Sequence, residues 1–389
     1  MRMAITAGSL YTPTERIDQP LVVVENGVIA EVASRATREI SAGLNVVDLG
    51  DVSLAPGFID THIHGAAGHD VMEQDRDALA SVAQLLAQHG VTSYLPTTIT
   101  APVEKTLTAL ERLADAIEAD ESKPGNYGLR AQPVGIHLEG PFLSHARRGV
   151  HPPACLLPPT LATFEKFWQA ARGHIKVITI APELEGACEV IAEATQRGVC
   201  VSLGHSDADL KATQAGVAAG ARRATHTFNA MRPLEHREPG ILGEVLTDDR
   251  LSAEIIVDGV HVDPMIVRLF LHAKGDDGAV LVTDGTAATG MPDGKYRLGG
   301  LEVEVKDGKC LADGRLAGSV LTMDRAVRNV MKFGNWDLQR TVRLATLNPA
   351  RTIGMAGTIG KLAPGAAADM VALSATGQVR KTIIRGRIA

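Results

Sequence analysis

The stretch PGFIDTHIHG, residues 56–65, ends a short apolar run with two histidines, His62 and His64. Five later runs lead in the same way into an imidazole or a carboxylate: GIHLEGPF (135–142) into Glu139, VSLGHSDA (201–208) into His205, ATHTFNAM (224–231) into His226, DGVHVD (258–263) into His261 and LVTDGT (281–286) into Asp284. Imidazoles and carboxylates suit zinc or ferrous iron, and no thiolate accompanies them. The set therefore indicates an open, catalytic type of metal site.

The middle of the chain alternates between short apolar runs and helical patterns. Eight runs predict strands: 58–62, 91–97, 132–138, 176–180, 199–204, 223–227, 252–257 and 279–284. Most precede a stretch in which apolar residues recur at three and four positions and a glycine follows, as in ALASVAQLLAQHG (78–90). Eight strand–helix units predict an α/β fold, a parallel (β/α)8 barrel of the TIM type.

The two ends of the chain differ from the middle in their pattern of apolar and turn-forming residues. Residues 1–54 and 348–389 contain short β-type runs broken at Gly and Asn, which predict one small β-sandwich domain built from both ends. The barrel would then occupy residues 55–347. Within it, the DGK, GG and DG turns of about 285–318 predict an inserted β-hairpin after the eighth strand.

Composition excludes several classes of protein. The chain has 389 residues, a net charge of -6 and no run of five or more basic residues, so it lacks the charge pattern of a nucleic-acid-binding protein. No eighteen apolar residues stand together and the N-terminus lacks a signal sequence, so we expect a cytoplasmic protein without membrane association. The four cysteines form no CxxC pair, which argues against a disulfide framework.

The candidate ligands stand at the carboxyl ends of the predicted strands. In a barrel these ends surround one mouth, where residues far apart in the chain can meet. A single buried histidine is more often a hydrogen-bonded core residue, but several at the same strand ends favour a shared cation. Such a cation lowers the pKa of its water to about 7 and polarises a carbonyl, as hydrolysis of an amide or ester requires. Asp284 is the candidate acid/base, although a turn-capping role before Gly285 is the alternative for this residue alone.

The motifs also carry a resemblance. PGFIDTHIHG, HLEGPF, GHSDA, THTFNAM and TDG, in this order, resemble the amidohydrolase superfamily, and HLEGPF with THTFNAM resembles in particular its N-acetylglucosamine-6-phosphate deacetylases. GTIGKLAPGAAAD (357–369) is similar to the superfamily's small-domain signature. The resemblance implies that Glu139, His205 and His226 hold the principal metal and that Asp284 is the catalytic acid/base.

The same resemblance implies a set of substrate contacts. His151, in RRGVHPPA (147–154), matches the family's histidine near the acetyl carbonyl. Asn229, Ala230, Arg237 and His261 match the positions that bind the sugar phosphate. Cationic side chains and main-chain N–H groups are suitable donors to a dianion.

The number of metal ions is open at this stage. Some members of the family lack the HxH pair and use one metal, whereas this chain keeps both histidines. A second cation could lie on His62, His64 and Asp284, with Glu139 as the bridge. We expect one or two divalent ions per subunit, zinc or iron first, with manganese or cobalt as further options.

The resulting hypothesis is a metal-dependent hydrolase that converts N-acetyl-D-glucosamine 6-phosphate to glucosamine 6-phosphate and acetate, in amino-sugar catabolism or cell-wall recycling. Three alternatives stay open: the N-acetylgalactosamine 6-phosphate epimer as substrate, a cyclic amidohydrolase similar to dihydroorotase, and a non-catalytic scaffold of the same fold. Dihydroorotase-like relatives commonly use a carboxylated lysine, which no strand end supplies here, and scaffolds lose ligands that this chain retains. Homodimers are common in the family, so we expect one here.

Overall fold

A barrel of eight parallel strands forms the main body of the protein. The computed structural model describes residues 2–12, 15–75, 77–122 and 129–388. The barrel strands are β8 (Phe58–Ile63), β11 (Val91–Thr98), β13 (Ile136–Glu139), β14 (Ile175–Ile180), β15 (Cys200–Leu203), β16 (Arg223–Ala224), β17 (Ser252–Ile256) and β18 (Ala279–Val282). They pair in chain order, and a parallel bridge between Ile63 and Gly285 returns the last strand to the first. The predicted barrel is confirmed.

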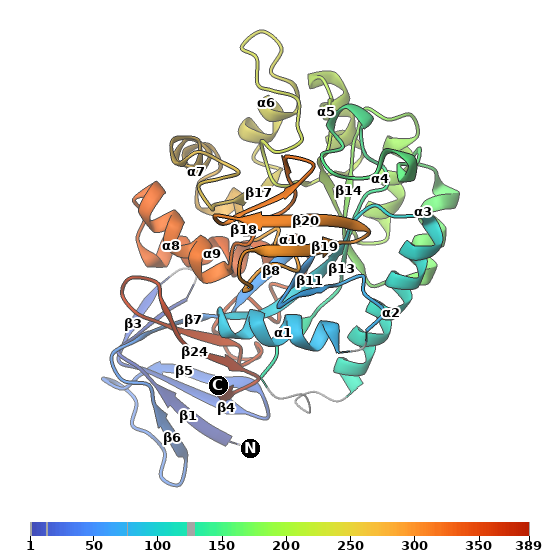
Figure 1. Cartoon of the computed structure of the whole chain (residues 1–389). Helices are drawn as coiled ribbons and strands as arrows, with labels where there is room; N and C mark the ends of the chain where they lie inside the picture. The colour runs from blue at the N-terminus through green and yellow to red at the C-terminus, as the bar shows by residue number, and fades with distance from the viewer. Residues whose placement is uncertain (1, 13–14, 76, 123–128, 389) are drawn as a thin grey trace.

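Helices surround the barrel (Figure 1). They are α1 (Ala78–Gln88), α2 (Val103–Ser122), α3 (Leu161–Ala170), α4 (Ala187–Gln196), α5 (Leu210–Ala219), α6 (Gly240–Thr247), α7 (Pro264–Gly278), α8 (Met323–Gly334), α9 (Leu338–Leu344) and α10 (Leu347–Thr352), with short 3-10 turns at His145–Arg147 and Pro153–Cys155. Local sequence explains their starts: the Asp209 carboxylate accepts the N–H of Ala212 at 2.7 Å, and Asp263 precedes a helix that begins with Pro264. The helices cover strands that are buried on both faces, as in β18.

The segment after β18 forms a small sheet that extends the predicted hairpin. Its strands are β19 (Gly294–Leu298), β20 (Leu301–Lys306), β21 (Lys309–Ala312) and β22 (Arg315–Leu316), all antiparallel. The segment forms four strands, and not the two of a single hairpin, because it contains two further tight turns. Both Asp307–Gly308 and Asp313–Gly314 have positive φ at each residue, as a two-residue type I′ turn requires, so the chain reverses twice more after the first hairpin.

The two ends of the chain form a second, smaller body beside the barrel (Figure 1). One sheet holds β1 (Arg2–Thr6), β4 (Pro20–Glu25), β5 (Val28–Ser34) and β6 (Asn45–Asp48), and the other holds β2 (Ser9–Tyr11), β3 (Arg16–Asp18), β7 (Ser53–Pro56), β23 (Met370–Leu373), β24 (Val379–Ile384) and β25 (Arg387–Ile388). Strand β7 pairs antiparallel with β23, and apolar residues from both chain ends share one core. The two-ended β domain is therefore confirmed, while its boundaries at residues 54 and 348 stay a prediction.

Three short strands complete the architecture. Strands β9 (Gly65–Ala66) and β10 (His69–Asp70) pair with each other directly after β8, and β12 (Gln132–Pro133) lies beside β11. Among the described residues no helix has the length and apolar character needed to cross a membrane. The four cysteines, Cys155, Cys188, Cys200 and Cys310, are free thiols.

Asp369 generates a prediction about pH and stability. This buried residue precedes β23, and its carboxylate accepts the main-chain N–H of Arg385 at 2.7 Å. Burial raises its pKa to about 6. Because the folded protein binds this proton more tightly than the unfolded chain, the group's contribution to the free energy of unfolding falls as pH rises from about 4 to about 6, by up to about 3 kcal/mol. Asp369→Asn, which cannot ionise, should therefore gain melting temperature relative to the wild type between pH 4 and pH 7. A difference between the two proteins that is constant over this range would contradict the prediction.

Candidate active site

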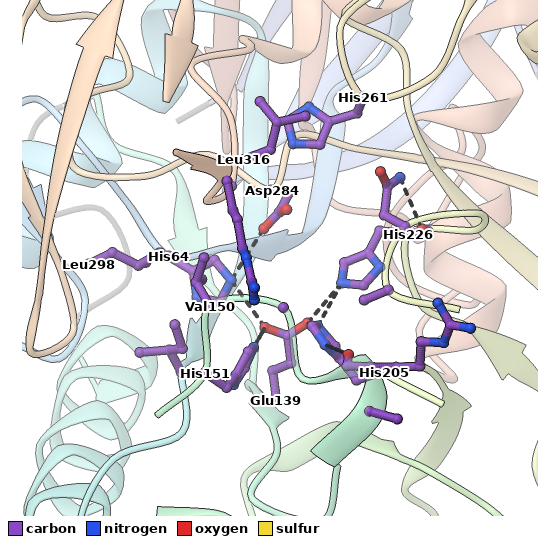
Figure 2. A pocket seen from close by; sticks show the side chains of 18 residues that line it. His64, Glu139, Val150, His151, His205, His226, His261, Asp284, Leu298 and Leu316 are labelled. Atoms are coloured by element: carbon purple, nitrogen blue, oxygen red, sulfur yellow. Dashed lines mark hydrogen bonds and ion pairs between the residues drawn. The ribbon is translucent and has the colours of Figure 1, made fainter. Parts of the chain in front are cut away.

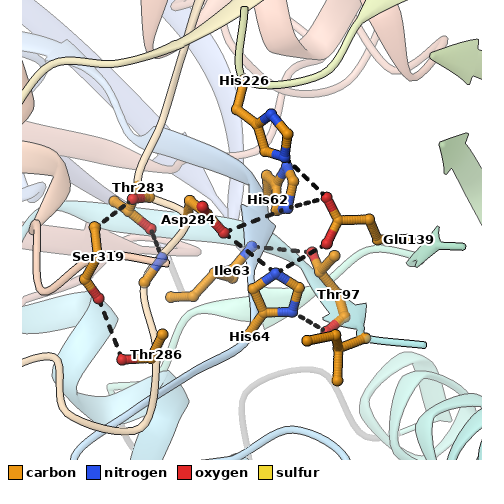
Figure 3. Close-up of polar contacts among 12 residues, drawn as sticks. His62, Ile63, His64, Thr97, Glu139, His226, Thr283, Asp284, Thr286 and Ser319 are labelled. Atoms are coloured by element: carbon orange, nitrogen blue, oxygen red, sulfur yellow. Dashed lines mark hydrogen bonds and ion pairs between the residues drawn. The ribbon is translucent and has the colours of Figure 1, made fainter. Parts of the chain in front are cut away.

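Glu139, the last residue of β13, lies at the centre of a buried group of histidines at the barrel mouth. Its carboxylate faces five imidazole Nε2 atoms: His226 at 3.1 Å, His205 and His64 at 3.3 Å, and His62 and His151 at 3.5 Å. Figure 2 and Figure 3 show these rings directed at the two oxygens from strand ends and, for His151, from the loop after β13. One carboxylate thus brings together residues that are up to 164 positions apart in the chain, from His62 to His226.

Asp284 faces the same group from the end of β18. Its Oδ1 lies 3.2 Å from His64 Nε2 and 3.5 Å from His62 Nε2. The main chain fixes it on both sides, since its N–H donates to the carbonyl of His62 and its own carbonyl accepts from the N–H of Ser319. Burial alone would raise the pKa of Asp284, but the hydrogen bond from His64 and the charge of His62 lower it below the ordinary value. The group is therefore ionised and available to accept a proton.

Backbone conformation at the strand ends directs these side chains into the mouth. His205, His226 and Asp284 have φ of 47°, 27° and 51°, in the left-handed region that residues other than glycine seldom adopt. Such conformations cost on the order of 1–3 kcal/mol each and persist where the surrounding structure enforces them. At these positions the left-handed conformation bends the main chain away from the direction of the preceding strand.

The electrostatic environment favours positive charge. Burial alone would lower the pKa of His62 and His64, but nearby carboxylates outweigh it. Glu139 and Glu254 raise the pKa of His62 well above its ordinary value, and Asp284 and Glu139 raise that of His64 to about 9. Positive charge at the place where these ligand atoms meet is therefore stabilised by the surrounding acidic groups.

The donor set fits a divalent cation. The ligand atoms of His62, His64 and Asp284 lie within 4.8 Å of one another. Nε2 of His62 is buried without a hydrogen-bond partner among the described residues. Nε2 of His205 and Nε2 of His226 are 3.0 Å apart, and a cation between them and Glu139 would satisfy both lone pairs. Imidazoles with carboxylates suit zinc, iron, manganese or cobalt, and the geometry does not select one of these metals.

A pocket of about 330 Å³ opens above this cluster. All the site residues predicted from sequence line it except His62, which lies beneath, and Arg237, which lies on the exposed segment between β16 and α6. Leu298, Arg315 and Leu316 of the inserted sheet line the pocket as well, so the insertion covers part of the barrel mouth (Figure 2).

His151 presents a neutral hydrogen-bond donor to the pocket. Its Nδ1 lies 3.4 Å from the main-chain N of Thr100, which donates to it, and 2.8 Å from the Thr100 hydroxyl. We therefore assign the proton to Nε2, which faces Glu139. Burial and the charge of His205 lower the pKa of His151 to about 4, so the ring is neutral at pH 7.

The remaining predicted residues lie farther from the cluster. His261, after β17, has its Nδ1 2.7 Å from Asp258 Oδ2, so its Nε2 is left for other partners. Asn229 donates its amide to the carbonyl of His226 at 3.2 Å, and Ala230 has a positive φ of 51° at the same turn. These three residues share the pocket with the buried histidines.

Sequence reasoning missed several charged residues at the site. Arg315, at the pocket mouth, makes no ion pair with any residue that the structure describes, whereas Arg147 pairs with Asp207 at 2.8 Å. Beneath the cluster, Glu254 and Arg223 form a fully buried ion pair that contacts His62. The sequence offered one signal for this pair, because Arg223 and Glu254 are charged residues within segments predicted to be buried strands. Nothing in the sequence marks Arg315, because its place depends on the fold of the inserted sheet.

Comparisons with known proteins agree with this architecture. The Amidohydrolase family profile matches residues 53–389. An N-acetylgalactosamine-6-phosphate deacetylase from Escherichia coli O157:H7 is 37% identical over 390 residues and is covered completely, as is this chain. An N-acetylglucosamine-6-phosphate deacetylase from Bacillus subtilis (strain 168) is 36% identical over 382 residues, 98% of this chain and 95% of that one.

Solved structures extend the likeness to three dimensions. A mutant N-acetyl-D-glucosamine-6-phosphate deacetylase from Mycobacterium smegmatis, in complex with N-acetyl-D-glucosamine-6-phosphate, has a TM-score of 0.91 and 35% identity, covering 100% of this chain and 99% of that one. The N-acetylglucosamine-6-phosphate deacetylase from Pasteurella multocida has a TM-score of 0.92 at 31% identity, with both chains covered completely. The resemblance inferred from the motifs is confirmed: this chain belongs to the amidohydrolase family.

Proposed function

We propose that the protein removes the acetyl group from N-acetyl-D-glucosamine 6-phosphate and releases glucosamine 6-phosphate and acetate. The observation that carries this proposal is the carboxylate of Glu139 shared by five buried imidazoles, with Asp284 facing the same pocket. The likeness to deacetylases of this name along the whole chain, one of them holding the sugar phosphate, supports the choice of substrate.

The residues around the pocket suit each step of the hydrolysis. A divalent cation on Glu139, His205 and His226 would supply an activated water and polarise the acetyl carbonyl. Asp284 takes the proton from the attacking water and returns it to the sugar nitrogen as the C–N bond breaks. His151 donates its Nε2–H to the carbonyl oxygen, where negative charge develops. Water thus adds to the acetyl carbon, and acetate and a free amine leave.

The substrate's phosphate would lie toward the part of the pocket that holds His261, Asn229 and Ala230. Arg237 does not line the pocket of this chain. Only the resemblance supports it as a further phosphate ligand. The expected homodimer, the cytoplasmic location and the role in amino-sugar catabolism or cell-wall recycling also stay predictions.

N-acetylgalactosamine 6-phosphate is the second candidate substrate. The Escherichia coli relative named for this epimer is as similar to this chain as the glucosamine-type relatives are. The other two alternatives have less support. No lysine is among the described residues that line the pocket, so a carboxylated lysine of the dihydroorotase type has no counterpart, and none of the expected ligands is missing as it would be in a scaffold.

One experiment decides among these functions. Acetate release should be measured with both N-acetylated sugar phosphates, on metal-free protein to which zinc, iron, manganese or cobalt is restored. We expect turnover of at least one sugar phosphate that depends on added metal. Absence of acetate release with every metal and both sugars would refute the proposal.

The first prediction from the proposed function concerns metal binding by Glu139. Glu139→Gln removes the charge that five imidazoles share, so metal affinity should fall by more than the roughly 10- to 100-fold typical of losing an outer-shell partner. Metal content after dialysis, measured by mass spectrometry, tests this. Glu244→Gln is the matched control, because Glu244 is also buried but its side chain contacts Gln214 on a neighbouring helix. Equal metal content in the two variants would contradict the assignment.

The second prediction concerns proton transfer by Asp284. Asp284→Asn should lower kcat by about 10²- to 10⁴-fold, the usual contribution of a general acid or base, while metal stays bound at Glu139, His205 and His226. Steady-state kinetics and metal analysis on the same sample separate the two effects. Asp115→Asn, on the exposed surface of α2, serves as control. Undiminished kcat in the Asp284→Asn variant would exclude the acid/base role.

The third prediction concerns phosphate binding by two arginines, Arg237 and Arg315. Arg237→Ala and Arg315→Ala should each raise KM for the phosphorylated sugar, by roughly 10- to 100-fold if one charged hydrogen bond is lost, with kcat little changed. KM for the unphosphorylated N-acetyl sugar should stay the same. Arg297→Ala, on the exposed part of β19, is the control within the same inserted sheet. An arginine whose removal affects both sugars equally does not bind phosphate.

A further inference from the structure

A buried ion pair lies inside the barrel, one layer beneath the histidine cluster. Arg223 begins β16 and Glu254 stands in the middle of β17, and both side chains are completely buried, with Nη2 and Oε1 2.8 Å apart. Removing two charges from water is costly, and apolar residues of similar size often give equal or greater stability. Fold stability alone therefore does not account for this pair.

The other oxygen of Glu254 contacts two residues of the cluster. Oε2 lies 2.9 Å from Nδ1 of His62, and it accepts the main-chain N–H of His226 at 3.1 Å. His226 is buried and has a strained φ of 27°, and a buried main-chain N–H needs an acceptor. One carboxylate thus fixes a ring on β8 and the backbone that carries a ring after β16.

This contact also determines the hydrogen position on His62. An ionised carboxylate only accepts hydrogen bonds, so Nδ1 of His62 carries a proton, and release of the second proton when a cation binds leaves the lone pair on Nε2. Nε2 faces Glu139 Oε1 and Asp284 Oδ1, each at 3.5 Å, and has no hydrogen-bond partner among the described residues (Figure 3). Metal-bound histidines commonly have this arrangement, with a carboxylate behind the ring.

Arg223 is itself held in place from the far side. Its Nη1 donates to the Thr352 hydroxyl of α10 at 2.9 Å, and Nη2 donates to the Thr61 hydroxyl of β8. The guanidinium therefore connects Glu254 to two further elements of the barrel. The chain Thr352, Arg223, Glu254, His62 runs from α10 to the candidate metal cluster.

We propose that Glu254, supported by Arg223, is a positioning residue that sets the tautomer and orientation of His62 and thereby the affinity for a cation at His62, His64 and Asp284. The inference rests on the metal site of the proposed function. It assigns a role to two residues that do not line the pocket.

A different reading would place a cation between His62, His137 and Glu254, whose ligand atoms also lie within 4.8 Å of one another. The hydrogen bonds of His137 argue against it. Its Nδ1 is 3.1 Å from the Thr61 carbonyl, and its Nε2 is 2.8 Å from the Thr179 hydroxyl. Both nitrogens are therefore occupied, and Glu254 is already paired with Arg223.

The test is metal binding by Glu254→Gln, with Glu244→Gln as the matched buried control. Wild-type, variant and control proteins are stripped of metal and titrated with Co²⁺, and affinity, ions per subunit and the visible absorption of cobalt are recorded. We expect the weaker of two cobalt ions to bind about 10- to 100-fold less tightly in Glu254→Gln, with an altered cobalt spectrum. Glu244→Gln should match the wild type.

Folding is controlled separately. Glu254→Gln leaves the charge of Arg223 buried without a partner, which is strongly destabilising in other proteins. The double variant Glu254→Gln/Arg223→Gln removes both charges, and it should show the same loss of cobalt affinity with a melting temperature nearer the wild type.

Unchanged cobalt affinity and spectrum in both Glu254 variants would overturn the positioning role, and so would a third cobalt ion in the wild type that Glu254→Gln removes. Failure of the proposed function looks different, because wild-type protein would then release no acetate whatever the cobalt titration gives.

Discussion

The structure depends on the register of eight parallel strands that closes the barrel, since this register places Glu139 where histidines from four other strand ends and loops can reach its carboxylate. A carboxylate surrounded by imidazoles at 3.1 to 3.5 Å is stable only if positive charge is present among them. Because the fold brings buried acidic groups together, a cation among them is electrostatically favoured. Closing the barrel therefore assembles the cluster that suits a cation.

The charges around the cluster form two levels. At the upper level, Glu139 raises the pKa of both His62 and His64, and Asp284 raises that of His64. At the lower level, Glu254 is paired with Arg223, raises the pKa of His62 together with Glu139, and fixes the direction of a hydrogen bond to that ring.

The sequence predicted the barrel and most of the pocket because both depend on local patterns. Each buried strand is an apolar run, and each site residue follows such a run directly, so strand order alone placed Glu139, His205 and Asp284 at one mouth. Contacts that depend on register or side-chain direction were not predictable in this way. Glu254 points into the barrel only because β17 pairs in this register with β16, and the pocket position of Arg315 depends on two additional type I′ turns.

The inserted sheet gives the pocket two chemically different ends. The deep end contains the imidazoles and carboxylates that suit a cation and an acetyl group, and it is almost completely buried. The outer part is lined by Leu298, Arg315 and Leu316, which are contributed by a segment that plays no part in closing the barrel. Because the strand ends fix the chemistry and the insertion lines the mouth, the insertion can vary without disturbing the ligands. The strand ends therefore supply the reacting groups, and the inserted sheet supplies part of the outer pocket wall.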